Sequence, residues 1–293
     1  MDYIKTTGVD MNTENRLELE YFKKMYNCDN SIGDLTPTVC TITGTKLPKQ
    51  CVAETIAAIA DQTARVTGKI DGIEKVLIFC PDAAGEVQRQ RFPELFARVE
   101  KLAGFRFLSS AVMPSVTPVC FATIFSGAAP IEHGIRQYAK PVLSIETLFD
   151  VLAEAGKQVA IVSINTCSID CIFRNRNIDY FSFRSDEASY EMTGKLIAEG
   201  KYDVIISYYT DYDSKSHKYG NWSDEAVDSL KTAVSYFEKL VDDTEIYWAA
   251  NNRAVIWAPD HGNHMVDEKS AGHGQNIADD MVVNHYYRIR SKE

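Results

Sequence analysis

The sequence lacks long hydrophobic runs, internal repeats and low-complexity segments. Its longest apolar candidate, CFATIFSGAAPI at 120–131, is interrupted by glycine and proline and is shorter than the roughly 20 apolar residues that span a bilayer. The N-terminal segment has no basic start followed by an apolar core, which is the pattern of a signal peptide. From these absences we expect a cytoplasmic protein with no membrane partner.

Paired cysteines and excess positive charge are also missing. The seven cysteines form an odd, scattered set, which predicts reduced thiols and no disulfide framework. Cys167 and Cys171 have no second Cys/His pair nearby, which argues against a zinc ribbon. With 31 Lys+Arg against 41 Asp+Glu, the net charge is −10. Such a surface repels polyanions, so we expect no nucleic-acid polymer as a partner.

Strand and helix patterns alternate along most of the chain. Continuous apolar runs predict buried strands, and 3.6-residue periodicity ending at glycine predicts helices. The strands are expected near 76–80, 158–164, 203–209 and 254–260, and the helices near 93–104, 144–156 and 224–247. This alternation indicates an α/β fold with a mostly parallel sheet.

Residues 1–70 are less regular than the rest. Two helices are expected near 14–26 and 50–66, joined by the turn-rich segment 29–39. We therefore divide the chain into an N-terminal helical extension or subdomain, 1–70, and a core domain, 71–293. Whether the extension is a flap on the sheet or an arm that forms a homo-oligomer stays open at this point.

Acidic and histidine side chains follow three of the predicted strands. Asp82 comes after the first strand, Asp211 and Asp213 after 203–209, and Asp260 with His261 after the apolar part of the last strand, 254–258. Ligands of open α/β sheets bind outside the carboxyl ends of the strands, where these carboxylates would repel each other without a cation. A lone Asp at such a place more often caps a helix. Three such strand ends together favour a site for zinc or manganese, which accept carboxylate and imidazole ligands.

Local spacing strengthens the metal hypothesis. Asp213 and His217 are four residues apart, so on a helix they share one face, whereas Asp211 lacks this spacing. Gly262 permits a tight turn and the close approach of a ligand after Asp260 and His261. His273 lies between two glycines in a polar loop, which does not suit a core histidine.

The segment from Thr117 to Gly127 predicts a short helix. Thr117 is a good N-cap, Pro118 suits the first helical position, and Gly127 suits the end. A well-capped buried helix is the simpler interpretation. The same geometry also holds a hydroxyl at the positive end of a helix, where an anion can bind. Beside metal ions, that hydroxyl could act as a nucleophile.

Together these segments resemble the alkaline phosphatase superfamily, most closely its nucleotide pyrophosphatase/phosphodiesterase branch. The resemblance covers residues 76–275 with the motifs in the family's order. The matching motifs are Asp82; Thr117 with Gly127 ten residues on; Pro130, His133, Gly134 and Ile135; Asp213, His217 and Gly220; Asp260-His261-Gly262; and Gly272-His273-Gly274. The resemblance implies a three-layer α/β/α sandwich with a mostly parallel central sheet.

The resemblance also implies two divalent ions, zinc first and manganese second, and a small phosphate ester as substrate. It assigns one ion to Asp213, His217 and His273. It assigns the other ion to Asp82, Asp260, His261 and the oxygen of Thr117. Thr117 would attack phosphorus to give a phosphothreonine, whether the substrate is a monoester, a diester or a phosphonate. Two divalent ions outweigh three aspartates, so the negative net charge does not exclude an anionic substrate.

Two departures from the branch leave other functions open. Cys120 stands where diesterases have an asparagine, and only eleven residues separate His261 from His273. A phosphomutase-like phosphotransferase and a non-catalytic relative that binds metal or phosphate are the alternatives. A sulfatase is disfavoured, because the run after Thr117 lacks the sulfatase arginine.

Substrate contacts and the remaining histidines complete the predictions. We expect phosphate contacts from Cys120 by its position, from Lys215 beside the Asp213 motif, and from the planar fork of Arg174. Solvated lysines are the commoner case. His133 and His285 are expected to be structural, and His264 to lie near the substrate or in solvent.

Overall fold

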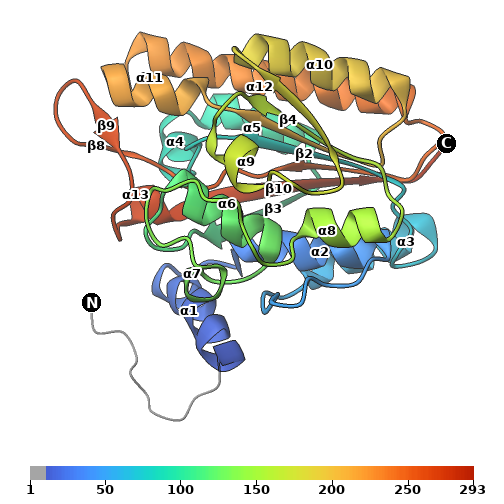
Figure 1. Cartoon of the computed structure of the whole chain (residues 1–293). Coiled ribbons are helices and arrows are strands. Elements are labelled where there is room, and N and C mark those ends of the chain that lie inside the picture. Colours follow the sequence, from blue (N-terminus) through green and yellow to red (C-terminus); the bar gives the residue numbers. More distant parts are fainter. Residues whose placement is uncertain (1–10) are drawn as a thin grey trace.

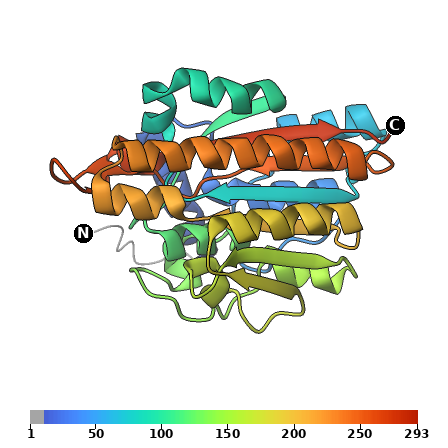
Figure 2. The same ribbon diagram turned by 90° about the horizontal axis from the view of Figure 1, so that it is seen from above.

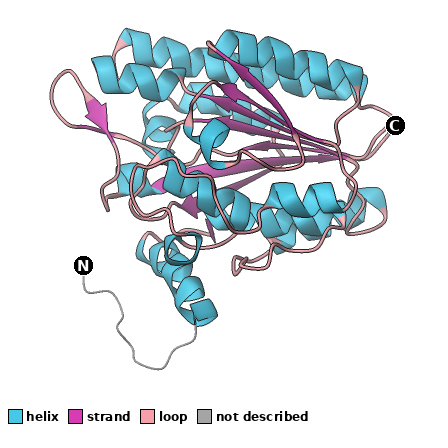
Figure 3. Ribbon diagram, viewed as in Figure 1, coloured by secondary structure: helices cyan, strands magenta, loops and turns pink. Residues whose placement is uncertain are grey.

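The computed structural model of the chain describes residues 11–293 (Figure 1). Residues 1–10, which contain part of the N-terminal segment considered for a signal peptide, lie outside the described residues. A large sheet carries helices on both faces, so the three-layer α/β/α prediction is confirmed (Figure 3). None of the described helices is long and apolar enough to cross a bilayer.

The central sheet has eight strands, and seven of them run parallel. Across the sheet they are β1 (Asn30–Ser31), β3 (Phe105–Ser110), β10 (Val282–Arg290), β7 (Arg253–Trp257), β2 (Lys75–Pro81), β6 (Val204–Tyr209), β4 (Val159–Ile164) and β5 (Asp179–Phe183). Strand β10 is antiparallel to both of its neighbours. A separate hairpin is formed by β8 (His264–Met265) and β9 (Ala271–Gly272).

Two groups of helices cover the sheet. One face carries α4 (Glu86–Arg91), α5 (Pro93–Leu102), α10 (Asp186–Glu199), α11 (Asp211–Tyr219) and α12 (Asp224–Tyr247), and the view from above shows α12 between α5 and α10 (Figure 2). The other face carries α2 (Leu35–Thr43), α3 (Ala57–Thr67), α6 (Thr117–Ser126), α8 (Leu148–Glu154) and α9 (Ser168–Ile172), with α1 (Met11–Met25) and α7 (Pro130–His133) beyond them (Figure 1). Helix α13 (Ala278–Met281) precedes β10.

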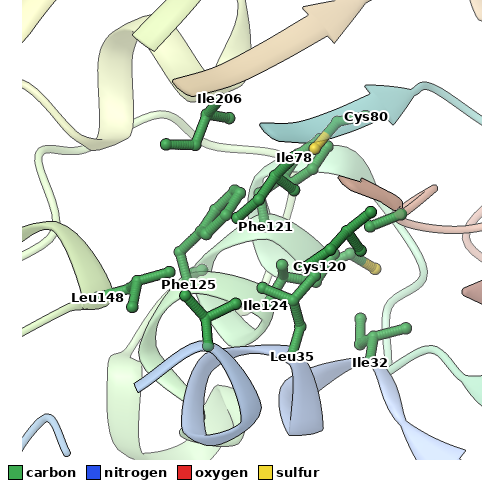
Figure 4. Close-up of a cluster of buried hydrophobic side chains, with 14 of the residues drawn as sticks. Ile32, Leu35, Ile78, Cys80, Cys120, Phe121, Ile124, Phe125, Leu148 and Ile206 are labelled. Atoms are coloured by element: carbon green, nitrogen blue, oxygen red, sulfur yellow. The ribbon is translucent and has the colours of Figure 1, made fainter. Parts of the chain in front are cut away.

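Strand β2 shows why its sequence is apolar throughout. Ile78 and Cys80 point to the core beneath α6, and Leu77 and Phe79 point to the core beneath α12. All four side chains are fully buried, since helices cover both faces. Phe121 of α6 belongs to the first of these cores (Figure 4), which anchors α6 against the sheet.

The prediction of a turn over residues 29–39 is wrong. This segment forms β1, a short 3₁₀ turn (Ile32–Asp34) and most of α2. Pro37 is tolerated because it is the third residue of α2, where the backbone N–H has no intrahelical partner. Helix α2 buries every side chain except that of Thr41, so it has no polar face from which periodicity could be recognised.

Two predicted helices are shorter than expected. Helix α8 begins at Leu148, because Thr147 and Asp150 form a capping box there. Helix α3 begins at Ala57, because the backbone of Ile56 is extended and the N–H groups of Val52 and Ala53 donate to the carbonyl of Gly127 at 3.0 and 3.1 Å. The elements that were not predicted include β3, β5 and α10.

The N-terminal region shares its packing with the rest of the chain. Ile32 and Leu35 lie in the same core cluster as Ile78 (Figure 4), and β1 pairs with β3. The division of the chain at residue 70 stays a prediction. All seven cysteines, which fall within the described residues, are free thiols, as expected.

Candidate metal centre

The carboxyl ends of three adjacent parallel strands bring the predicted ligands together. Strand β2 lies between β7 and β6, in register so that Pro81 pairs with Tyr209 and Phe79 with Trp257. Asp82 follows β2 directly, and the segments after β6 and β7 lead into the other acidic residues. Side chains from Asp82 to His273, which are 191 positions apart in sequence (273 − 82), therefore meet at one edge of the sheet.

Two groups of three side chains have ligand atoms within 4.8 Å of one another. In the first group, Asp213 Oδ2 is 3.4 Å from His217 Nε2, and Asp213 Oδ1 is 3.6 Å from His273 Nε2. In the second group, His261 Nε2 lies 3.6 Å from Asp82 Oδ1 and 3.3 Å from Asp260 Oδ2. The His261 and His273 rings stack at 4.0 Å between centroids, so the two groups adjoin.

Backbone carbonyls orient all three imidazoles. The Nδ1 atom of His217 is 2.9 Å from the Ala271 oxygen, that of His261 is 2.9 Å from the Gly262 oxygen, and that of His273 is 3.0 Å from the Ser115 oxygen. Because a carbonyl only accepts, each Nδ1 carries a proton. The Nε2 atoms of His217 and His273 lie 3.1 Å apart, and each is within 3.6 Å of an Asp213 oxygen. When unprotonated, these two Nε2 atoms can bind a shared cation together with Asp213.

Each of the three carboxylates keeps a buried oxygen without a hydrogen-bond partner among the described residues. These oxygens are Oδ1 of Asp82, Oδ1 of Asp213 and Oδ2 of Asp260. The second oxygen of Asp82 accepts from the Tyr208 hydroxyl, and that of Asp260 from the Ala83 N–H at 3.3 Å. An unpartnered buried carboxylate oxygen is unfavourable unless a cation binds it. Oxygen and imidazole donors of this kind fit divalent metals such as zinc.

The local electrostatics agree with a cation site. Burial, together with repulsion from Asp260, raises the pKa of Asp82 well above its usual value, and burial raises the pKa of Asp260 to about 7. Burial also acts to raise the pKa of Asp213, but hydrogen bonding to His217 and the nearby histidines lower it overall. Burial lowers the pKa of His261 and of His273 to about 4, so both imidazoles are neutral at pH 7, as a metal ligand must be.

Thr117 is the first residue of α6 and not its N-cap, contrary to the prediction. Val116 is the N-cap: its backbone is extended, and its carbonyl accepts from the N–H groups of Val119 and Cys120, both at 3.0 Å. The Thr117 hydroxyl therefore does not cap its own helix. It lies 3.3 Å from His261 Nε2, next to the second ligand group.

Gly262 is required for a different reason from the one expected. A Cβ atom at this position would lie 2.0 Å from the backbone oxygen of Asp279. The close neighbour of Gly262 is thus the protein's own backbone, and the approach of a ligand at this residue stays a prediction.

The predicted substrate contacts have other partners in this structure. Cys120 is fully buried, with Sγ 4.0 Å from the Val112 oxygen (Figure 4). Burial, and the nearby charges of Asp260 and Asp82, raise the pKa of its thiol, and its contact with phosphate stays a prediction. Lys215 pairs with Asp211 at 3.2 Å. Arg174 pairs with Asp170 and lies over the Tyr180 ring, 4.7 Å from its centroid. Both cations already have carboxylate partners, and their contact with phosphate stays a prediction.

The other histidines have structural partners. The His133 and Thr123 side chains meet at 3.0 Å, and His285 Nε2 lies 3.0 Å from the Pro259 oxygen, so both are core residues as predicted. His264 Nδ1 lies 2.7 Å from Asp280. The sequence did not reveal Tyr208 as a partner of Asp82, because its hydroxyl is hidden in the apolar run of β6.

Comparisons with known proteins show which solved structures share this fold. No protein-family model and no curated protein matches this sequence. Solved structures do match, and they show that the chain has the fold of the alkaline phosphatase superfamily.

Three of these structures illustrate the likeness. Phosphonoacetate hydrolase from Sinorhizobium meliloti 1021 has 18% identity and a TM-score of 0.50, over 68% of this chain and 59% of its own. Murine ectonucleotide pyrophosphatase/phosphodiesterase 5 has 14% identity and a TM-score of 0.51, over 67% and 59%. The C-terminal periplasmic domain of the phosphoethanolamine transferase EptC from Campylobacter jejuni has 12% identity and a TM-score of 0.53, over 74% and 80%. The match thus spans about three fifths of the first two proteins.

Proposed function

We propose that this protein is a metal-dependent phosphoryl-transfer enzyme that hydrolyses small phosphate esters. The observation that carries the proposal is the set of three carboxylates, each with a buried unpartnered oxygen, facing three inward-turned imidazole Nε2 atoms beside a threonine hydroxyl. Two structures with this fold are a phosphonoacetate hydrolase and a nucleotide pyrophosphatase/phosphodiesterase, both of which act on phosphorus compounds by name.

The two groups of side chains are the proposed ligands of two divalent ions. Asp213, His217 and His273 would hold one ion. The other ion would be held by the Asp82 group, which consists of Asp82, Asp260, His261 and the Thr117 oxygen. Zinc suits this donor set first and manganese second. When bound, such ions supply positive charge that polarises phosphoryl oxygens and favours ionisation of a nearby hydroxyl.

Thr117 is the proposed nucleophile. Its Oγ1 forms a bond to phosphorus while the bond from phosphorus to the leaving oxygen breaks, and the leaving group departs with a proton. Water then attacks the phosphothreonine, the bond from phosphorus to Thr117 breaks, and the hydroxyl is restored. A threonine-to-alanine variant of the murine relative is described as inactive and holds AMP, which supports a similar role for a threonine here.

Transfer to an alcohol in place of water is the second candidate. It is favoured by the likeness to a phosphoethanolamine transferase domain, of which the match covers 80%. In that case the acceptor alcohol, and not water, would remove the phosphoryl group from Thr117.

A substrate panel tests the proposed function. Protein loaded with zinc or manganese is assayed with a nitrophenyl monoester, a bis-nitrophenyl diester and a nitrophenyl phosphonate, with and without ethanolamine as acceptor. We expect chelator-sensitive release of nitrophenolate from at least one substrate. Release that depends on ethanolamine and yields a phosphorylated acceptor would indicate the transferase. Zero rates on all three substrates, with no stoichiometric metal bound, would refute both.

A further inference from the structure

A set of buried amide side chains lies beside the metal centre without belonging to the ligands. This amide cluster consists of Gln88, Asn221 and Asn263, whose exposed fractions are 0%, 0% and 1%. Gln88 comes from α4, Asn221 from the turn between α11 and α12, and Asn263 from the loop two residues after His261. Burying an amide without hydrogen bonds lowers the stability of the folded protein. The hydrogen-bond partners of these amides therefore show which segments the cluster connects.

One oxygen atom joins the whole cluster. Oδ1 of Asn263 accepts from Gln88 Nε2 at 2.7 Å and from Asn221 Nδ2 at 2.9 Å. The side-chain oxygen of Gln88, Oε1, accepts from the N–H of Gly85 at 2.9 Å. Since Gly85 lies three residues after Asp82, this chain of bonds connects the Asp82 turn, the loop after His261 and the end of α11. Each of these segments carries proposed metal ligands.

The amide cluster also borders α11 on the side next to its ligands. Tyr212 and Ser216 are four residues apart, like Asp213 and His217, and each precedes a ligand by one residue. Their side chains are 3% and 1% exposed. Ser216, Gln88 and Asn263 lie near the Tyr212 hydroxyl and act to lower its pKa, against the larger effect of burial that raises it. This hydroxyl has no hydrogen-bond partner among the described residues. The face of α11 next to the ligands is thus packed against the amide cluster.

Because of helix geometry, the contact between α11 and the amide cluster also determines the direction of the two ligand side chains on α11. Successive residues of a helix are about 100° apart around its axis, so one rotation moves both pairs of side chains together. Helix α11 has nine residues, and Gly220, whose φ is 88°, follows its last residue. A fixed Tyr212–Ser216 face therefore fixes the direction of Asp213 and His217.

We propose that Asn263 is a positioning residue, whose side-chain oxygen sets the distance between the two ligand groups by joining the three segments that carry them. It touches neither substrate nor metal and acts through the ligands. This inference rests on the proposed function, since it assumes that both groups bind ions.

The test compares Asn263→Leu with a matched control, Asn15→Leu. Asn15 is another fully buried amide with two hydrogen bonds, to the Gln50 oxygen at 3.2 Å and from the Ala129 N–H at 2.6 Å, and it joins α1 to the start of α7. Manganese is titrated into each metal-free protein, and electron paramagnetic resonance reports both the affinity and the magnetic coupling between two bound ions. Thermal unfolding is recorded in parallel.

We expect Asn263→Leu to weaken binding of at least one ion by about 10- to 100-fold and to change the coupled spectrum. Asn15→Leu is expected to lose stability but to keep the affinity and the spectrum of the wild type. Equal losses of affinity in both variants would overturn the positioning role, as would unchanged affinity and coupling in Asn263→Leu. Failure of the wild-type protein to bind two ions would instead contradict the proposed function.

Gln88→Met provides a second variant if Asn263→Leu does not fold. It removes one of the two donors to Asn263 and leaves Asn263 in place. At least about tenfold weaker binding of one ion is expected. Wild-type affinity and coupling in this variant would overturn the proposal.

Discussion

The buried Thr117 hydroxyl is free of its own helix because α6 starts one residue earlier than predicted. Because Val116 is the N-cap, the Thr117 side chain is not used by its own helix and faces His261. The core contacts of Phe121 and Phe125 hold α6 in place, so the hydroxyl is positioned by apolar packing as well as by polar contacts. A nucleophile held in this way needs little reorganisation before it reacts.

Replacement of Thr117 tests its role directly. We expect Thr117→Ala to lower kcat by at least about 1,000-fold at saturating metal, because the attacking oxygen is lost. Thr117→Ser, which keeps the hydroxyl, is expected to retain measurable turnover. Rates are measured on the best substrate of the panel, with bound metal counted for each variant. Full turnover by the alanine variant would remove Thr117 from the mechanism.

Residues that follow strands could be recognised from sequence, and their supporting partners could not. The motif of Asp260 and His261 was visible because the strand before it is apolar and the turn after it is polar. Asn263 and Tyr208 gave no comparable signal, since their roles depend on partners more than 40 residues away. Phosphate contacts of Lys215 and Cys120 were the least predictable, because lysines face solvent and cysteines pack in the core in many proteins.

Among the elements, central strands and amphipathic helices were the most predictable. Helix α12 has the predicted bounds because its apolar stripe and its polar face alternate over many turns. Helix α2 was missed because tertiary burial, and not its own periodicity, stabilises it. The shortened starts of α8 and α3 depend on a capping box and on hydrogen bonds to Gly127, which no single segment reveals.

Helix α7 joins α6 through a neutral histidine. His133 Nδ1 accepts from the Ile135 N–H at 3.2 Å, so the proton is on Nε2, which donates to Thr123 at 3.0 Å. Burial lowers the pKa of His133 to about 3. Between pH 6.5 and 3 the unfolded chain therefore binds a proton that the folded protein excludes, and the folded state loses stability as the pH falls.

His133→Asn tests this contribution of α7. Asparagine can still accept from Ile135 but does not titrate. We expect the variant to be less stable than the wild type at pH 7.5 and the difference to shrink by about 2 kcal/mol on going to pH 5. Urea denaturation at both pH values measures it, and His285, which titrates in both proteins, cancels in the comparison. A difference that does not change with pH would contradict the neutral, buried state.

For the whole molecule, bound metal is expected to contribute to stability. Two buried carboxylates, of Asp82 and Asp260, and the half-buried carboxylate of Asp213 meet at the carboxyl edge of the sheet of a protein whose net charge is −10. A ligand that binds only the folded state stabilises it by about 2.7 kcal/mol when present at 100 times its dissociation constant. Zinc or manganese should therefore raise the unfolding temperature by several degrees.

Calorimetry of chelator-treated and metal-loaded protein measures this effect. Asp213→Asn is the matched control, because it removes one ligand charge and should reduce the increase on adding metal. Identical unfolding temperatures with and without metal in the wild type would contradict a two-ion site. The cytoplasmic location and the formation of a homo-oligomer stay predictions at this scale.

The order of the strands determines when, during synthesis on the ribosome, the proposed metal ligands can come together. Strand β7 lies beside β2, although 171 residues separate Pro81 from Arg253, and the last proposed ligand is His273. A nascent chain that has emerged only as far as α11 holds Asp82, Asp213 and His217 but not Asp260, His261 and His273. We therefore expect both ligand groups to be complete only after His273 has emerged. Until then, the carboxylates at this edge of the sheet lack most of their imidazole partners.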